Sequence, residues 1–180
     1  MDVLDAIRTR RSIRKYRPEP VPPAMVHALL QAVFASPSAM DARPWQFVVI
    51  DDTDLLRRLG AEMPHCEMLL SAPLGVLICA DPAQERAPGF WPQDCAAAAQ
   101  NLLLAAHHLG LGAVWIGLYP MDDRMEAVRR AVAVPPEMVP FALIAVGFPA
   151  EQLSPENRFD PRKLHHNRWG CPFTNEGKTE

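Results

Sequence analysis

The sequence predicts a β-sheet covered by helices, in the α/β or α+β class. Short runs rich in β-branched and aromatic residues alternate along the chain with segments of helical periodicity. The 180 residues, of which 49% are hydrophobic and 22% charged, suffice for one domain with a buried core. The 19 prolines fall mostly between the apolar runs, which indicates short connections rather than disorder.

Each element has its own local pattern. The expected strands are 45–50, 74–80, 112–119 and 141–147, and the expected helices are 2–10, 22–36, a third around 55–59 that breaks near Gly60, 93–109 and 122–133. Asp2 can cap the first helix, Pro23 stands in the first turn of the second, and Gly110 stops the fourth. The polar tail 150–180 has too little apolar content to fold alone, so it must cover its own domain or reach a partner chain.

Composition excludes several classes of protein. A net charge of -3 gives no broad basic face for nucleic acid. No apolar run has the length of a membrane span, and the N-terminus lacks the pattern of a secretory signal. The 4 cysteines are scattered without a CxxC pair, so we expect a cytoplasmic protein with reduced thiols, although disulfides remain an alternative.

Familiar catalytic patterns are missing or misplaced. Residues 110–112 (GLG) follow a helix and open a strand, which is the reverse of a dinucleotide-binding glycine motif. The adjacent histidine pairs 107–108 and 165–166 point in different directions and predict no zinc site. No GxSxG is present, so no side-chain nucleophile is expected.

The basic segment 8–17 is the strongest candidate for a site. It contains 6 basic residues and no acidic ones. Charge runs of this kind are often only solvated surface, and that interpretation stays open. However, Arg10, Arg11 and Ser12 crowd donors onto adjacent residues just past a helix end, and arginine forks suit phosphate oxygens. The segment therefore indicates a site for an anion.

Four segments in order resemble the nitroreductase family of FMN-dependent oxidoreductases. They are 10–16 (RRSIRKY), 36–49 (SPSAMDARPWQFVV), 100–117 with its QNLLLAA and GLGAVWIG, and 161–169 with its PRK and HNRW. The resemblance covers nearly the whole chain. It implies an α+β, three-layer fold with a mixed central sheet flanked by helices, a single domain over 1–180, and a homodimer that exchanges the tail 150–180 and holds FMN at its interface.

The resemblance also implies roles for particular residues. The FMN phosphate and ribityl chain would be held by Arg10, Arg11 and Ser12, with Arg162 and Lys163 returning to the phosphate. Arg14 would lie near the pyrimidine edge, where a cation stabilises negative charge on the reduced ring. Ring contacts from the other subunit would come from Pro37, Ser38, Ala39 and Asp41. Ile116 and Gly117 would lie near flavin N5.

The implied reaction is a ping-pong transfer of hydride from NADH or NADPH through flavin N5 to an electron-poor acceptor such as a nitroaromatic or a quinone. The cofactor would carry the chemistry. Two positions depart from the family pattern, with Asp41 in place of asparagine and Arg43 in place of glutamine, and a carboxylate only accepts hydrogen bonds. Asp41 could pair with Arg43 or Arg14, or it could disfavour the anionic reduced flavin, and either would alter redox behaviour. Asp41 keeps open the alternative of an FMN store or redox sensor without efficient turnover. A specialised family reaction, such as ene reduction, dehalogenation or flavin destruction, is the second alternative.

Overall fold

The computed structural model describes residues 1–173 and confirms the α+β class. Within this range one four-stranded sheet has the order β1-β2-β4-β3, with strands β1 Trp45–Ile50, β2 Leu74–Ala80, β3 Gly112–Gly117 and β4 Val139–Gly147. All three strand pairings are antiparallel. A parallel pairing occurs in the described chain at the isolated bridge between Ser12 and Ala113, so the parallel part of the predicted mixed sheet is limited to that bridge.

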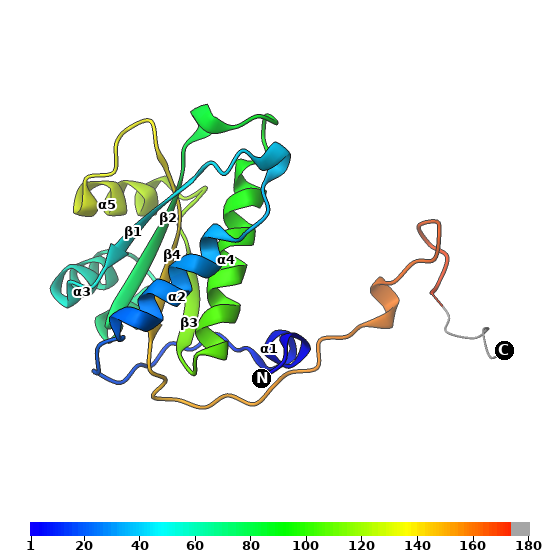
Figure 1. The fold of residues 1–180 in the computed structure, drawn as a ribbon, viewed down its shortest axis with the longest axis horizontal. Helices are drawn as coiled ribbons and strands as arrows, with labels where there is room; N and C mark the ends of the chain where they lie inside the picture. The colour runs from blue at the N-terminus through cyan, green and yellow to red at the C-terminus, as the bar shows by residue number, and fades with distance from the viewer. Residues whose placement is uncertain (174–180) are drawn as a thin grey trace.

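The sheet is the middle of three layers (Figure 1). Successive side chains of a strand point to opposite faces, and both faces of β2 are buried. Val76 and Ile78 join the core cluster formed with the helices α2 Pro23–Phe34 and α4 Trp91–His108. Leu77 and Cys79 join the cluster formed with α3 Thr53–Glu62 and α5 Asp122–Val132. The three-layer expectation is therefore confirmed.

Most element boundaries lie within two residues of the sequence prediction, and four differences have a local explanation or consequence. The predicted break near Gly60 was wrong: α3 continues through Gly60, which packs closely against Leu69, and a Cβ on Gly60 would lie only 3.0 Å from the Leu69 Cβ. Helix α4 begins at Trp91, two residues early, with Pro92 in its first turn. Strand β4 begins at Val139, and β3 ends at Gly117 because the N–H groups of both following residues donate to the Phe141 carbonyl.

The N-terminal segment is tied to the sheet near the start of β3. Helix α1 Val3–Thr9 is capped by the Asp2 carboxylate, which accepts from the Asp5 N–H at 2.9 Å. After α1, Ile13 N donates to the Ala113 carbonyl at 3.1 Å and Arg17 N donates to the Phe148 carbonyl at 2.9 Å. The basic segment therefore runs along the lower end of β3 and β4.

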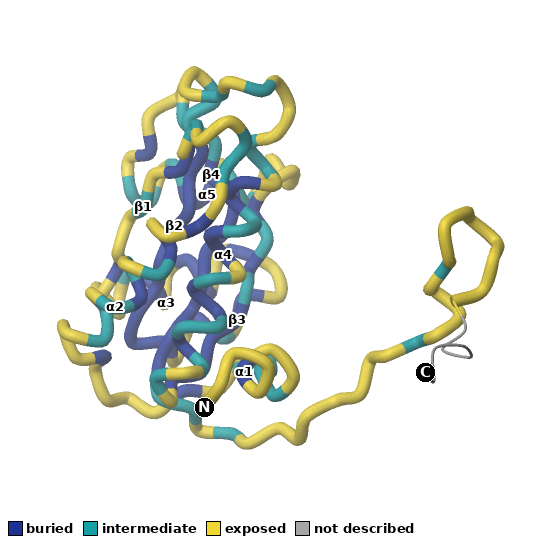
Figure 2. The backbone as a smooth tube through the Cα atoms, turned by 45° about the vertical axis from the view of Figure 1, so that its right-hand side comes forward, coloured by how far each residue is buried: buried dark blue, intermediate teal, exposed yellow. Residues whose placement is uncertain are grey.

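The chain after 150 passes close to α1 and then leaves the body (Figures 1 and 2). Its described residues are almost all exposed, and Trp169 is 89% exposed. Among the described helices, none combines the length and apolar character needed to cross a membrane.

Candidate functional site

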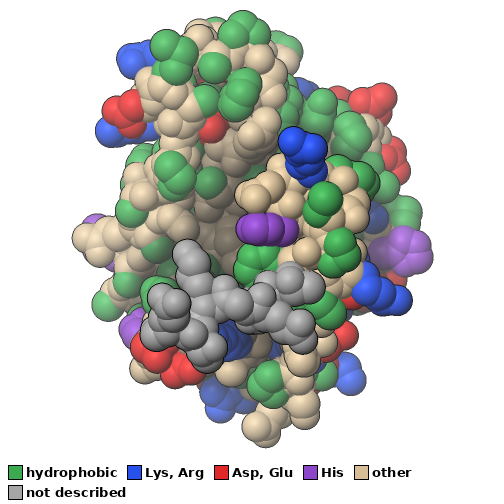
Figure 3. All heavy atoms as spheres, turned by 90° about the vertical axis from the view of Figure 1, so that its right-hand side faces the viewer, with side chains coloured by type: hydrophobic (Ala, Val, Ile, Leu, Met, Phe, Trp, Pro, Cys, Tyr) green, Lys and Arg blue, Asp and Glu red, His purple; other side chains and the backbone are tan. Residues whose placement is uncertain are grey.

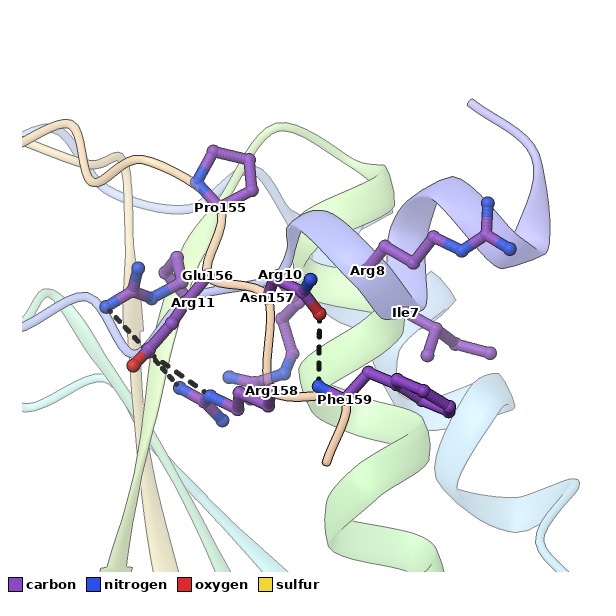
Figure 4. Close-up of a pocket in the computed structure, with 9 residues that line it drawn as sticks. All are labelled: Ile7, Arg8, Arg10, Arg11, Pro155, Glu156, Asn157, Arg158 and Phe159. Atoms are coloured by element: carbon purple, nitrogen blue, oxygen red, sulfur yellow. Dashed lines mark hydrogen bonds and ion pairs between the residues drawn. The ribbon is translucent and has the colours of Figure 1, made fainter. Parts of the chain in front are cut away.

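Two segments far apart in sequence form a basic cavity of about 610 Å³ between α1 and the outgoing tail (Figure 4). Its lining includes four arginines and one carboxylate, which are Arg8, Arg10, Arg11, Arg158 and Glu156. Figure 4 shows Arg8 directed away from the others, so three guanidinium groups and one carboxylate face one another.

Charge in this cavity is unbalanced. Burial, then Arg158 and Arg11, lower the pKa of the Arg10 guanidinium. The Glu156 carboxylate accepts from Arg158 at 3.0 and 3.2 Å and lies 3.5 Å from Arg11. The pKa of Glu156 is lowered by the hydrogen bond from Arg158 and by the positive charges of Arg158 and Arg11. A cluster that disfavours its own cations in this way is suited to receive an anion.

Local structure fixes where Arg10, Arg11 and Arg14 point. Thr9 Oγ1 lies 2.8 Å from His107 Nε2 at the end of α4, which holds the end of α1. The Glu151 carboxylate accepts from the Arg14 N–H at 2.6 Å, so the turn that carries Arg14 is bound to the chain after β4. The Arg14 side chain itself is exposed and makes only a 3.4 Å contact with the Ser12 carbonyl.

Strand β3 has an open edge above this cluster. Successive residues of an antiparallel strand direct their N–H and C=O groups to alternate sides. The Ala113 carbonyl faces the N-terminal segment, because it accepts from Ile13 N, and the Gly117 carbonyl accepts from Arg124 at 3.0 Å. By this alternation the N–H groups of Trp115 and Gly117 point to the edge of β3 that faces away from β4, as the Ala113 carbonyl does. In the described chain this edge carries no further strand.

The loop 37–43 has an unusual backbone. Met40, Asp41 and Arg43 have φ of 50°, 51° and 50°, which is the left-handed region that non-glycine residues rarely adopt. The Asp41 carboxylate accepts two hydrogen bonds from Arg43, at 2.6 and 2.8 Å, and this lowers the pKa of Asp41. The Ser38 hydroxyl oxygen accepts from Arg43 N at 2.9 Å.

The structure brings together only part of the predicted set. Arg10, Arg11 and Ser12 lie by the lower end of β3, and Ile116 and Gly117 lie at its upper end. The loop with Pro37, Ser38, Ala39 and Asp41 contacts the start of α4 through Asp94, whereas Thr9 contacts its end through His107. Since 13 helical residues span about 20 Å, the loop and the basic cavity lie at opposite ends of α4 (Figure 1).

Arg162 and Lys163 are not near the basic cavity of their own chain. They lie in a short 3-10 turn, Pro161–Lys163, in the part of the tail that has left the body (Figure 1). The Arg162 guanidinium is 88% exposed and binds Asp160 at 2.9 Å. Among the described tail residues, the basic one that lines the cavity is Arg158, which the motifs did not indicate. Its only sequence signal is a basic residue in a polar tail, which does not distinguish it from Arg162.

Arginines from two distant segments thus converge at one end of an open strand edge. The profile of the nitroreductase family matches residues 7–66 and 61–148 of the chain. A protein of Methanothermobacter thermautotrophicus, provisionally named NADH dehydrogenase/NAD(P)H nitroreductase, is 46% identical over 169 residues, which cover 94% of this chain and 88% of that protein. The chain therefore belongs to the nitroreductase family, as its motifs predicted.

Solved structures agree. A provisionally named NADH dehydrogenase/NAD(P)H nitroreductase from Bacteroides thetaiotaomicron is 40% identical, with a TM-score of 0.88 and coverage of 92% of this chain and 97% of that chain. A provisionally named nitroreductase from Desulfovibrio desulfuricans, solved in complex with FMN, is 33% identical, with a TM-score of 0.81 and coverage of 94% and 98%.

Proposed function

We propose that this protein is an FMN-dependent NAD(P)H oxidoreductase, a homodimer that holds FMN between its subunits and passes hydride by way of flavin N5 to an electron-poor acceptor such as a nitroaromatic or a quinone. The observation that carries the proposal is the cavity in which Arg10, Arg11 and Arg158 converge at the foot of the β3 edge. FMN is the ligand of one similar structure, and NAD(P)H appears in the names of relatives.

The phosphate end of FMN fits the basic cavity. Planar guanidinium groups donate paired hydrogen bonds to phosphate oxygens, and the cavity holds more positive than negative groups. Arg10, Arg11 and Arg158 would hold the phosphate, with Ser12 next to them. Arg162 and Lys163, which the resemblance assigned to the phosphate, would need the tail of the partner subunit to reach it.

The ring end fits the upper part of β3. Ala113 and Gly117 are four residues apart, or about 13 Å along a strand. A ligand with its phosphate in the cavity near Ala113 could therefore extend along the open edge of β3 to Gly117. A Cβ built on Gly117 would meet no atom within 4 Å, so there is space for a planar group beside Ile116 and Gly117. The edge N–H of Gly117 is a donor for a ring nitrogen or carbonyl.

Several features support a dimer. The ring-contacting loop 37–41 lies at the far end of α4 from the cavity of its own chain, so a second copy would have to supply it. Helix α1 exposes Val3, Leu4 and Ile7 rather than burying them. Hydrophobic side chains lie among the charged ones on the face turned toward the tail (Figure 3). Exposed apolar surface of this kind marks interaction sites, and the tail 150–180 is a segment available for exchange.

FMN, when bound, supplies the hydride chemistry, so the side chains serve to bind and to adjust charge. The resemblance assigns Arg14 to the pyrimidine edge of the ring, where its exposed guanidinium would stabilise negative charge on the reduced flavin. Asp41 is not an isolated carboxylate, because Arg43 engages both of its oxygens. This pairing offsets the negative charge that would disfavour the reduced flavin, and it favours turnover over the alternative of a flavin store.

The test is spectroscopic. The purified protein, reconstituted with FMN, should show the visible absorption of bound flavin, and anaerobic NADH or NADPH should bleach it. Added nitroaromatic or quinone should restore the colour. Absence of bound flavin after reconstitution would overturn the proposal, and flavin that neither NADH nor NADPH reduces would identify a store or sensor instead.

A pair of variants tests the phosphate end. Arg10→Ala combined with Arg11→Ala removes two charge-assisted donors, each contributing about 1.5–3 kcal/mol, so the Kd for FMN should rise by roughly a hundredfold or more. Lys15→Ala is the matched control, since Lys15 is exposed and does not line the cavity. Equal FMN affinity in the double variant and in the control would contradict the phosphate assignment.

A further inference from the structure

Helix α4 carries two polar side chains on a face that is otherwise alanine and leucine. Asp94 is 5% exposed, and Asn101 is half-buried one heptad later. Residues seven apart lie on the same side of a helix, about 10 Å apart. Polar groups in such a position stabilise the fold only where they satisfy other buried polar groups.

Both side chains bind the segment that leads from α2 to β1. The Asn101 amide donates to the Ala32 carbonyl at 3.2 Å and to the Ser36 hydroxyl oxygen at 2.8 Å. Asp94 Oδ1 accepts from the Ala39 N–H at 2.9 Å. Asn101 thus holds the start of the loop, and Asp94 holds the point where the left-handed residues begin.

The loop needs this support. Met40, Asp41 and Arg43 each have positive φ, and such a conformation costs about 1–2 kcal/mol for a residue with a Cβ. Among the described residues, the other side-chain contacts of the loop involve exposed groups. Arg43 N donates to the Ser38 hydroxyl at 2.9 Å, Arg86 donates to the Met40 carbonyl at 3.2 Å, and the Asp41–Arg43 pair is more than half exposed on both sides. The hydrogen bond from Ala39 to Asp94 is therefore the anchor that reaches the core.

The second carboxylate oxygen of Asp94, Oδ2, is buried and has no hydrogen-bond donor among the described residues. Asp94 stands in the first turn of α4, where the helix dipole favours a negative charge. A buried acceptor without a partner is a standing cost to stability. Such a cost is more easily understood if the residue serves the conformation of the loop rather than the stability of the core.

We propose that Asp94 is a positioning residue, which holds the 38–43 loop in the left-handed conformation that presents it to FMN. The role rests on the proposed flavin site, in which this loop contacts the ring bound to the other subunit. Asp94 does not touch the ring itself. It acts through one hydrogen bond, the one from the Ala39 N–H.

Two single variants remove this hydrogen bond from opposite ends. Asp94→Ala deletes the acceptor. Ala39→Pro deletes the donor without changing a core residue. The backbone is compatible with proline here, because Ala39 is the first residue of a 3-10 turn and the preceding residue, Ser38, is extended at φ -143° and ψ 154°. Asp94→Asn retains an acceptor oxygen and is the rescue variant. Asp54→Ala, at an exposed first-turn aspartate of α3, is the matched control.

The readouts are the Kd for FMN, the visible circular dichroism of bound flavin, and kcat and KM for one quinone acceptor. Asp94→Ala and Ala39→Pro should each raise the Kd by roughly fivefold or more and change the dichroism. Asp94→Asn should recover most of the affinity. The double variant Asp94→Ala with Ala39→Pro should be no worse than either single one, because both act on the same bond.

Three results would overturn the role of Asp94: unchanged Kd and dichroism in Ala39→Pro, additive effects in the double variant, or equal loss in Asp54→Ala. If Asp94→Ala does not fold, Ala39→Pro and Asp94→Asn decide alone. A wild-type protein that binds no FMN would instead refute the proposed function, which the flavin spectrum of the unaltered chain reports separately.

Discussion

Gly112 at the start of β3 is the position where a single methyl group should disturb both the fold and the site. A Cβ on Gly112 would lie 2.6 Å from Ile13 Cγ2 and 2.7 Å from Ile13 Cβ. Carbon atoms pack best at about 3.5–4.0 Å, so Gly112→Ala must push the two segments apart. Such overpacking costs about 1–3 kcal/mol. In a chain of this length that lowers Tm by roughly 2–12 °C.

The same displacement should weaken FMN binding. Ile13 follows Arg10, Arg11 and Ser12, and its N–H is bonded to the Ala113 carbonyl at 3.1 Å. Moving Ile13 therefore moves the arginines relative to the β3 edge. Thermal unfolding by circular dichroism and an FMN titration measure the two effects.

Gly117→Ala, in the same strand, is the matched comparison. Its Cβ would meet no atom within 4 Å, so the free energy of unfolding should stay the same or rise by about 0.4–1 kcal/mol, and Tm should not fall. The new methyl group would enter the space proposed for the ring, so FMN affinity or turnover should fall. A Gly112→Ala protein as stable as wild type, or a Gly117→Ala protein that loses stability, would refute the reasoning.

Three further predictions follow from single groups. Arg158→Ala should raise the Kd for FMN by roughly tenfold or more. Arg162→Ala should have a much smaller effect, because the Arg162 guanidinium binds Asp160, whereas that of Arg158 lies in the cavity with Glu156. Titration of both variants with FMN checks this, and a larger effect of Arg162→Ala would restore the original assignment to Arg162. Burial and then the charge of Arg10 lower the pKa of His107 below its usual value. The unfolded chain therefore binds the proton more readily, and stability should fall as pH drops from 7.5 to about 5.5. Tm at the two pH values should differ less in His107→Gln than in the wild type, and an equal difference would contradict the assignment. Burial raises the pKa of Cys79 and Cys95 to about 12, so iodoacetamide should modify the exposed Cys171 first, as peptide mass spectrometry can show; early modification of either buried thiol would contradict this.

Much of the fold was predictable because it depends on short-range periodicity. The run 74–80 is apolar throughout, and it forms β2 with both faces buried. Gly110 does end α4 close to the predicted place, with a φ of 76°. The break expected at Gly60 failed, because the absence of a Cβ there serves close contact with Leu69 rather than a turn.

The candidate site was only partly predictable. The crowded donors and the family motif pointed to Arg10, Arg11 and Ser12, and two of them, Arg10 and Arg11, line the basic cavity. The family motif pointed to Arg162, and no local pattern points to Arg158. The sequence left open whether Asp41 pairs with Arg43 or with Arg14, or acts as a lone charge beside a cofactor, and in the structure Asp41 and Arg43 form a bidentate pair.

The sequence by itself determined the class of fold, the order of the elements, the family and the basic segment that lines the cavity, because each depends on residues that are neighbours along the chain. Tertiary structure alone decided which arginine of the tail joins that segment. Arg11 donates to the Ser154 carbonyl, 143 residues away, and this contact brings Arg158 into the cavity while Arg162 leaves with the tail. Contacts at such a separation depend on the packing of every element between them, and residue spacing cannot encode them.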